Sequence, residues 1–156
     1  MARIWQNWLM VWCGAVGLFG LVLVGSGWPT ASGPVTAVLE VMNGPQTLQF
    51  EPHLRFSLGL LGAVTLGWSL TLAVAFRLVP LLDPDHRPRA WQGITAAIVA
   101  WYIVDSTLSV ATGFWPNAAS NTVFVLGFLV PVALSGVLRP ARGNGQRATA
   151  REGTVA

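Results

Sequence analysis

Four apolar runs, each about as long as a membrane-spanning helix, constrain the fold of this chain more than any other feature. They cover residues 5–24, 56–79, 90–112 and 121–138. A helix needs roughly 20 apolar residues to cross the hydrocarbon core of a bilayer. Only 10% of the residues are charged, which is too few for an ordinary soluble surface. The sequence therefore predicts an all-α integral membrane protein, a four-helix bundle that forms a single domain over residues 1–138.

The first apolar run also admits a second interpretation. Arg3 precedes it and small residues follow it at positions 30–32, which is the general order of a cleaved signal peptide. The basic region is short, however, and Trp5, Trp8 and Trp12 place indoles along one helical face near the membrane interface, where tryptophan is enriched. These residues favour a retained first span.

The connections between the runs differ in length and composition. Residues 25–55 form the longest one, which is expected to face outward, and the stretch 34–44 within it starts with proline and has apolar residues at helical spacing. This pattern predicts a short amphipathic helix, although its β-branched residues leave a strand possible. Residues 139–156 are mostly Gly, Ala and Arg, and are expected to form a disordered basic tail.

The distribution of arginine predicts the orientation in the membrane. Eight of the nine arginines lie at the amino terminus, in or beside the second connection, or in the carboxyl tail, and only Arg55 lies in the first connection. Cytoplasmic connections carry the excess of basic residues, so both termini and the middle connection are predicted to be cytoplasmic. Because the arginines flank apolar runs instead of forming a polar basic surface, no nucleic-acid partner is expected.

Small residues recur at every fourth position of the second run, and they predict a helix-packing face. These residues are Gly59, Ala63, Gly67, Thr71 and Ala75. Such a stripe lets two membrane helices approach backbone to backbone, but it does not say whether the partner helix belongs to this chain or to a second copy. Gly14, Gly17 and Gly20 form a comparable series in the first run, for which helix packing is again expected.

Asp105 is the only acidic residue within an apolar run. An ionised aspartate there costs about 2.5–3.5 kcal/mol on insertion scales, so it needs partners or a proton. The proposed polar cluster around it consists of Arg55, Asn117 and Asn121 from neighbouring spans, with Ser109 and Trp101 on its own helical face. Two interpretations stay open: a cluster that fixes helix register, or a proton-titrating or ligand-binding site open to the outer surface.

No residue pattern indicates catalysis, a metal site or a cofactor. Cys13 is the only cysteine, which excludes an intrachain disulfide or a cysteine zinc site. The two histidines lie in connections, where they do not suit a membrane haem. Asp83, Asp85 and His86 share one connection, but its prolines favour a solvated turn over a metal site. The residues available as a second reactive group near Asp105 are Tyr102, Ser106, Ser109 and His53.

Two motifs carry a resemblance to a known group of proteins. RFSLGLLGAVTLGWSLTL in the second run, followed by WYIVDSTLSVATGFWPNAASNTVFVLGFLVPVAL over the last two, resembles uncharacterised small four-span bacterial membrane proteins. The resemblance covers residues 55–138 and implies four helices in a bacterial inner membrane, with no activity to transfer. The chain also has four spans like the small multidrug transporters, but it lacks the acidic residue that they carry in their first helix.

The function expected from these observations is non-enzymatic. We predict an accessory or structural subunit that acts through helix packing, with the lipid bilayer, a second copy or a membrane-protein complex as its partners. The alternative is a small proton-coupled carrier or ligand-binding membrane protein that uses Asp105.

Overall fold

The computed structural model describes residues 1–44 and 50–139, and every regular element in these ranges is a helix. The four helices long and apolar enough to cross a membrane are α1 (Arg3–Gly25), α3 (Pro52–Leu78), α4 (Arg87–Ala111) and α5 (Trp115–Leu134). The shorter elements are α2 (Gly33–Asn43) and the single 3₁₀ turns η1 (Pro29–Ala31) and η2 (Val79–Leu81). The prediction of an all-helical chain with four long apolar helices is confirmed. The tail predicted to be disordered lies outside the described residues from position 140 onward.

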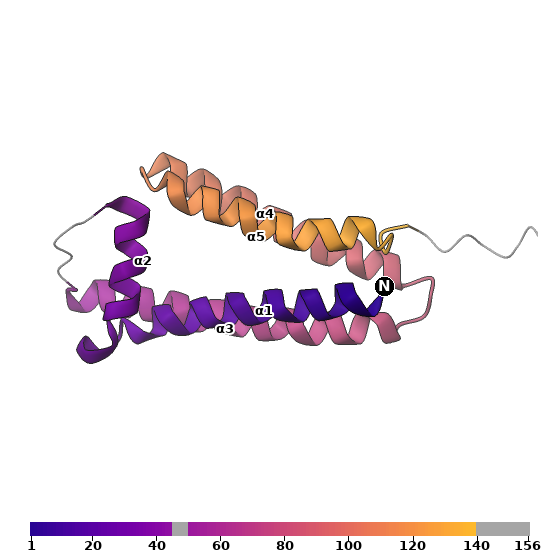
Figure 1. Ribbon diagram of the computed structural model, residues 1–156, viewed down its shortest axis with the longest axis horizontal. Helices are drawn as coiled ribbons and strands as arrows, with labels where there is room; N and C mark the ends of the chain where they lie inside the picture. The colour runs from indigo at the N-terminus through magenta and orange to yellow at the C-terminus, as the bar shows by residue number, and fades with distance from the viewer. Residues whose placement is uncertain (45–49, 140–156) are drawn as a thin grey trace, which may run out of the picture.

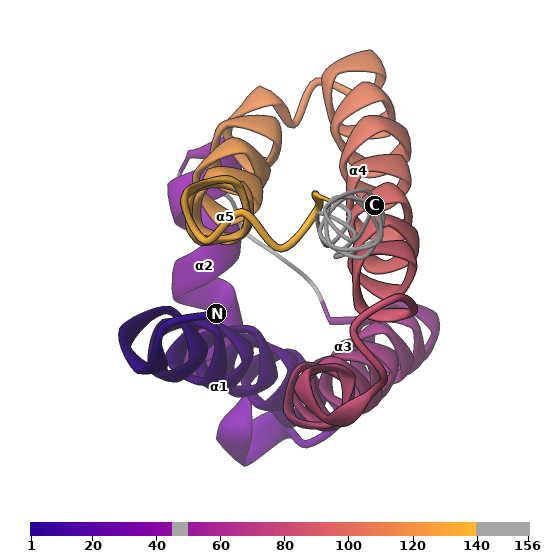
Figure 2. The ribbon, with the colours of Figure 1, turned by 90° about the vertical axis from the view of Figure 1, so that its right-hand side faces the viewer.

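The four long helices form two pairs, α1 with α3 and α4 with α5 (Figure 1). The pairs lie close together at the end where α1 begins and α5 ends, and they separate toward the opposite end (Figure 1). We call these the narrow end and the wide end of the bundle. Seen from the narrow end, the two pairs face each other across the molecule (Figure 2). Helix α2 crosses between the pairs at the wide end, where it contacts α1 and α5.

Aromatic side chains join the two pairs in the half of the bundle nearer the narrow end. The ring of Phe76 on α3 stacks on Trp91 of α4, with centroids 5.5 Å apart, and on Phe128 of α5, at 5.8 Å. Trp12 of α1 meets the same Phe128 at 5.9 Å. All four of these side chains are buried. Because rings from all four long helices meet here, this cluster holds the two pairs together at the narrow end.

The α1 and α3 helices approach each other backbone to backbone at Gly20 and Gly62. A Cβ atom added to Gly62 would lie 2.6 Å from the carbonyl oxygen of Gly20, and one added to Gly20 would lie 2.9 Å from that of Gly62. Gly17 is buried in the same contact, whereas a Cβ at Gly14 would meet no atom within 4 Å. The predicted packing role of the glycines in the first span is therefore confirmed for Gly17 and Gly20 and is wrong for Gly14.

The small-residue stripe of α3 lies outside this contact. A Cβ added to Gly59 or Gly67 would have no neighbouring atom within 4 Å, and Ala63 is exposed. Because successive residues of a helix differ by about 100° in direction, the face of Ala63 is turned away from that of Gly62. Among the described residues, no helix of this chain covers the stripe. The interpretation that a helix of the same chain packs on it is wrong, and packing against a second copy stays a prediction.

All four long helices begin earlier than the apolar runs suggested: α1 begins at Arg3 instead of residue 5, and the other three each have a proline in the first turn. Proline is tolerated there since its missing N–H would have no helical partner. Helix α3 begins at Pro52 instead of residue 56, α4 at Arg87 instead of 90, and α5 at Trp115 instead of 121. As a result, Arg55 belongs to the first turn of α3, and both asparagines of the predicted polar cluster lie within α5. The predicted short helix of the first connection is present as α2.

Pro131 lies inside α5 and removes a hydrogen-bond donor from that helix. Without its N–H, the carbonyl of Gly127 four residues earlier lacks the usual helical partner. The indole Nε1 of Trp8 on α1 donates to this carbonyl oxygen at 2.7 Å. Trp12 Nε1 donates to the carbonyl oxygen of Phe124 at 2.9 Å. Two tryptophans of α1 thus bond to the backbone of α5, and Trp8 satisfies the carbonyl group that Pro131 leaves without its helical partner.

Candidate functional site

The candidate site is a polar cluster around Asp105, which lies in the last two turns of α4 near the wide end. Its Oδ1 atom accepts hydrogen bonds from the Nδ2 atoms of Asn117, at 2.9 Å, and Asn121, at 3.0 Å. Ser109 Oγ lies 3.2 Å from the same oxygen. One carboxylate oxygen is therefore surrounded by donors from both helices of the α4 and α5 pair, which is the arrangement that lowers the cost of an acidic group in a membrane.

Simple helical spacing brings these side chains together. Ser109 follows Asp105 by four residues on α4, and Asn121 follows Asn117 by four on α5, so each pair shares one helical face. Residues 112–114 connect the two helices, and Gly113 has a φ of 86°, in the left-handed region that glycine adopts most readily. This tight reversal places the first two turns of α5 beside the last two turns of α4.

Further bonds fix the orientation of the donors. Asn117 Nδ2 donates its second proton to Ser109 Oγ at 2.8 Å, and the Ser109 hydroxyl has its shortest contact, 2.7 Å, with the backbone carbonyl oxygen of Asp105. Asn121 Nδ2 also lies 3.5 Å from Ser106 Oγ. Since each amide has a second contact, the two carboxamides are held with their N–H groups toward the acid.

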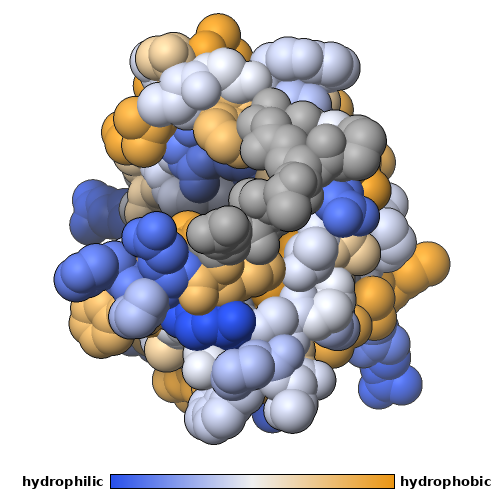
Figure 3. Space-filling view, turned by 90° about the vertical axis from the view of Figure 1, so that its left-hand side faces the viewer, coloured by the Kyte–Doolittle hydropathy of each residue, from blue (hydrophilic) through white to orange (hydrophobic). Residues whose placement is uncertain are grey.

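The second carboxylate oxygen of Asp105, Oδ2, differs from the first. It accepts no hydrogen bond from any described residue, and it is not among the fully buried polar atoms without a partner, which in the described part of the chain are limited to Thr95 Oγ1. Oδ2 is therefore not completely buried. In the view onto the wide end, hydrophilic surface lies recessed below the tips of α4 and α5 (Figure 3).

An aromatic layer lies next to the cluster on the side of the narrow end. Trp101 lies one turn from Asp105, and its ring packs on Trp68 of α3 with centroids 5.2 Å apart. The Tyr102 hydroxyl lies 3.0 Å from Thr122 Oγ1 and forms a second polar link between α4 and α5. The structure thus directs Trp101 toward α3, and it adds a Tyr102 and Thr122 link that the sequence analysis missed. Tyr102 precedes Asp105 by three residues and so lies on the same side of α4. No sequence pattern indicated Thr122 as its partner.

Arg55 does not join the cluster, and its predicted pairing with Asp105 is wrong. Its Nε atom donates to the carbonyl oxygen of Phe50 at 3.1 Å, and its Nη1 atom donates to the carbonyl oxygen of Ser26 and to Ser32 Oγ, both at 2.8 Å. The guanidinium therefore ties the start of α3 to the end of α1 and to the residue before α2. The physical reason is proximity in the fold: α3 pairs with α1, while the acid faces α5.

The cluster has the chemistry of a hydrogen-bonded carboxylate with one available oxygen. Oδ2 keeps its lone pairs for a further donor, such as water or a protonated amine, or for a proton. No group of three or more His, Cys, Asp and Glu side chains suited to a metal ion occurs within residues 1–44 and 50–139. Comparison with protein-family models, curated proteins and solved structures finds no match to this chain.

Proposed function

We propose that this protein is a non-enzymatic multi-pass membrane protein, an accessory or structural subunit that packs α3 against a helix of a second copy or of another membrane protein. The observation that supports this most is the uncovered stripe of Gly59, Ala63 and Gly67, which α3 carries in addition to the Gly62 contact with α1. Membrane helices associate through close van der Waals packing at such faces, because small residues let the backbones approach.

The polar cluster fits this proposal as an internal support. It links α4 to α5 through the hydrogen bonds that Asn117 and Asn121 donate to Asp105. Interhelical hydrogen bonds of this kind fix the register of membrane helices at a modest gain of about 0.6–2 kcal/mol each. The α4 and α5 pair then supports the α1 and α3 pair, which carries the stripe.

We further propose that the protein lies in a bacterial inner membrane with both termini in the cytoplasm. The start of α1 and the end of α5 lie at the same end of the bundle (Figure 1), and most arginines belong to that end or to the chain beyond it. The narrow end is then cytoplasmic, and the wide end, with α2 and the Asp105 cluster, faces outward.

Cysteine labelling tests this orientation. In a chain that also carries Cys13→Ser, the exposed positions Asp85 and Glu51 are each replaced by cysteine. We expect a membrane-impermeant maleimide to label Glu51→Cys but not Asp85→Cys in intact cells, because the two residues lie at opposite ends of the bundle. Both variants should react after permeabilisation, which serves as the control. Labelling of Asp85→Cys from outside would contradict the orientation.

Substitution within the stripe tests the packing function. Gly67→Leu adds a side chain that the chain itself has room for, so the fold should persist while a partner helix is held away. We expect self-association or co-purification with a membrane partner, measured by single-molecule photobleaching or quantitative pull-down, to weaken by about tenfold or more. Gly93→Leu, an equally open glycine on α4, is the matched control and should leave association unchanged. A parent protein that is monomeric in bilayers and retains no partner would refute the proposal.

A small proton-coupled carrier or ligand-binding protein is the second candidate. The observation that favours it is the Oδ2 atom of Asp105, which accepts no hydrogen bond from any described residue and is not completely buried, so that a proton or a cationic ligand would have an acceptor there. The two candidates differ in the stability that they predict for a variant with an uncharged residue at position 105.

A further inference from the structure

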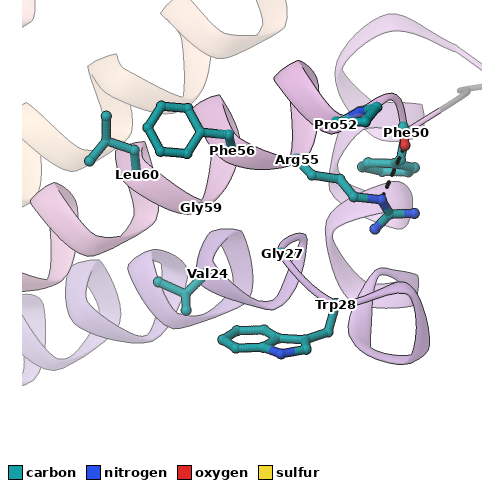
Figure 4. A pocket seen from close by; sticks show the side chains of 9 residues that line it. All are labelled: Val24, Gly27, Trp28, Phe50, Pro52, Arg55, Phe56, Gly59 and Leu60. Carbon is teal, nitrogen blue, oxygen red and sulfur yellow. Dashed lines mark hydrogen bonds between the residues drawn. The ribbon is translucent and has the colours of Figure 1, made fainter.

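A groove of about 570 Å³ lies at the wide end of the α1 and α3 pair (Figure 4). Val24 and Trp28 form one wall from the end of α1 and the turn after it, and Phe56 and Leu60 form the other from the first turns of α3. Gly59 lies between the walls, and a Cβ added to it would meet no atom within 4 Å. The groove is thus mainly apolar, and it is open at Gly59 because that residue has no side chain.

Among the described residues that line this groove, only Arg55 is charged. Its Nε and Nη1 atoms are held by the hydrogen bonds to Phe50, Ser26 and Ser32, and the guanidinium lies 5.0 Å from the centre of the Phe50 ring. Its Nη2 atom makes no hydrogen bond within the described part of the chain. The guanidinium is therefore fixed in place at low entropic cost and still has N–H groups to offer an anion.

The surrounding charges favour an anion as well. Pro52, the first residue of α3, also lines the groove, and the start of a long helix carries a partial positive charge. Glu51 and His53 flank Pro52 in the sequence, but neither lines the groove. Among the described residues, the walls of the groove therefore carry one cation and the start of a helix, and Glu51 is not one of the lining residues.

The position of the groove favours one kind of anion. Trp28, Phe56 and Leu60 are 61%, 70% and 53% exposed, although they lie where two membrane-spanning helices end and begin. An exposed tryptophan and an arginine at such a position are typical of the interface between headgroups and acyl chains. A cation beside an apolar channel at this depth complements a molecule with a phosphate at one end and a hydrocarbon chain at the other.

We propose that this groove binds an anionic phospholipid. The phosphate headgroup accepts hydrogen bonds from the free N–H groups of Arg55, and one acyl chain lies along Val24, Gly59 and Leu60. This site is separate from the Asp105 cluster, and it shares Gly59 with the stripe of the proposed function.

Native mass spectrometry of the detergent-purified protein tests the site, using phosphatidylglycerol and phosphatidylcholine with identical acyl chains. We expect the parent to bind phosphatidylglycerol more tightly than phosphatidylcholine. Gly59→Leu fills the groove and should weaken phosphatidylglycerol binding about tenfold or more. Gly67→Leu places the same side chain two turns further along the same stripe, outside the groove, and should bind like the parent.

Three outcomes would overturn the proposal. The first is equal binding of the two lipids by the parent, and the second is an equal loss of binding in Gly59→Leu and Gly67→Leu. The third is full displacement of the lipid by soluble glycerophosphoglycerol, which would show a site for a free anion. Arg55→Gln should abolish the preference for phosphatidylglycerol; because Arg55 also supports the fold, Gly59→Leu keeps the proposal testable if that variant does not fold.

Discussion

Gly62→Leu is expected to lower the free energy of unfolding by about 3 kcal/mol or more, the largest effect of any substitution considered in the membrane helices. A Cβ atom at this position would lie 2.5 Å from the backbone nitrogen of Val24 and 2.6 Å from the carbonyl oxygen of Gly20. Both are backbone atoms of α1, so relief of the clash requires α1 to move away from α3. The closest helix contact of the bundle is then lost.

The measurement is reversible unfolding in mixed micelles of a mild detergent and dodecyl sulfate. Gly93→Leu is the matched control, since it introduces the same side chain into open space outside the stripe and should change stability by about 0.5 kcal/mol or less. If Gly62→Leu were as stable as Gly93→Leu, α1 and α3 would not approach each other at Gly20 and Gly62 as described.

Asp105→Leu is expected to have the second largest effect, a loss of about 2–3 kcal/mol in stability at neutral pH. The substitution removes the acceptor for the carboxamide N–H groups of Asn117 and Asn121, and these donors then face an apolar side chain. Asp105→Asn keeps one acceptor oxygen but loses the charge-assisted bonds, so a smaller loss of about 1 kcal/mol is expected. Thr107→Leu, at an exposed position on the same helix, is the control and should leave stability unchanged.

Thermal unfolding of detergent-purified Asp105→Asn also separates the two candidate functions. A lower melting temperature than the parent at neutral pH would show that the carboxyl group of Asp105 supports the α4 and α5 pair, as the packing function expects. A variant as stable as the parent, or more stable, would contradict the structural role. It would mean that the acid is retained despite its cost, which is typical of a proton or ligand site.

The sequence predicted the long helices well because hydropathy over about 20 residues is a strong signal. Their starts were predicted less well, since the prolines at positions 52, 88 and 116 lie outside the most apolar stretches and yet suit a first helical turn. The early start of α5 matters most, because it puts Asn117 on the same face as Asn121 and toward Asp105.

The partners of Arg55 could not be read from the sequence. Two of its three bonds go to backbone carbonyl groups, which every residue possesses and which leave no trace in side-chain identity. The sequence also did not show which face of α3 packs against α1. Gly59 and Gly67 form a regular pattern with Ala63, whereas Gly62 stands apart from it, and only the shape of α1 at Gly20 decides which face is used.

The polar cluster also has a consequence for assembly during insertion. Its hydrogen bonds connect residues only 12 and 16 positions apart, so α4 and α5 satisfy their polar groups as a hairpin without help from the rest of the chain. The bonds from Trp8 and Trp12 to α5 span 119 and 112 positions and require the first and last helices to be present together. We therefore expect the carboxyl-terminal hairpin to close first, and the amino-terminal pair to dock onto it as a preformed unit.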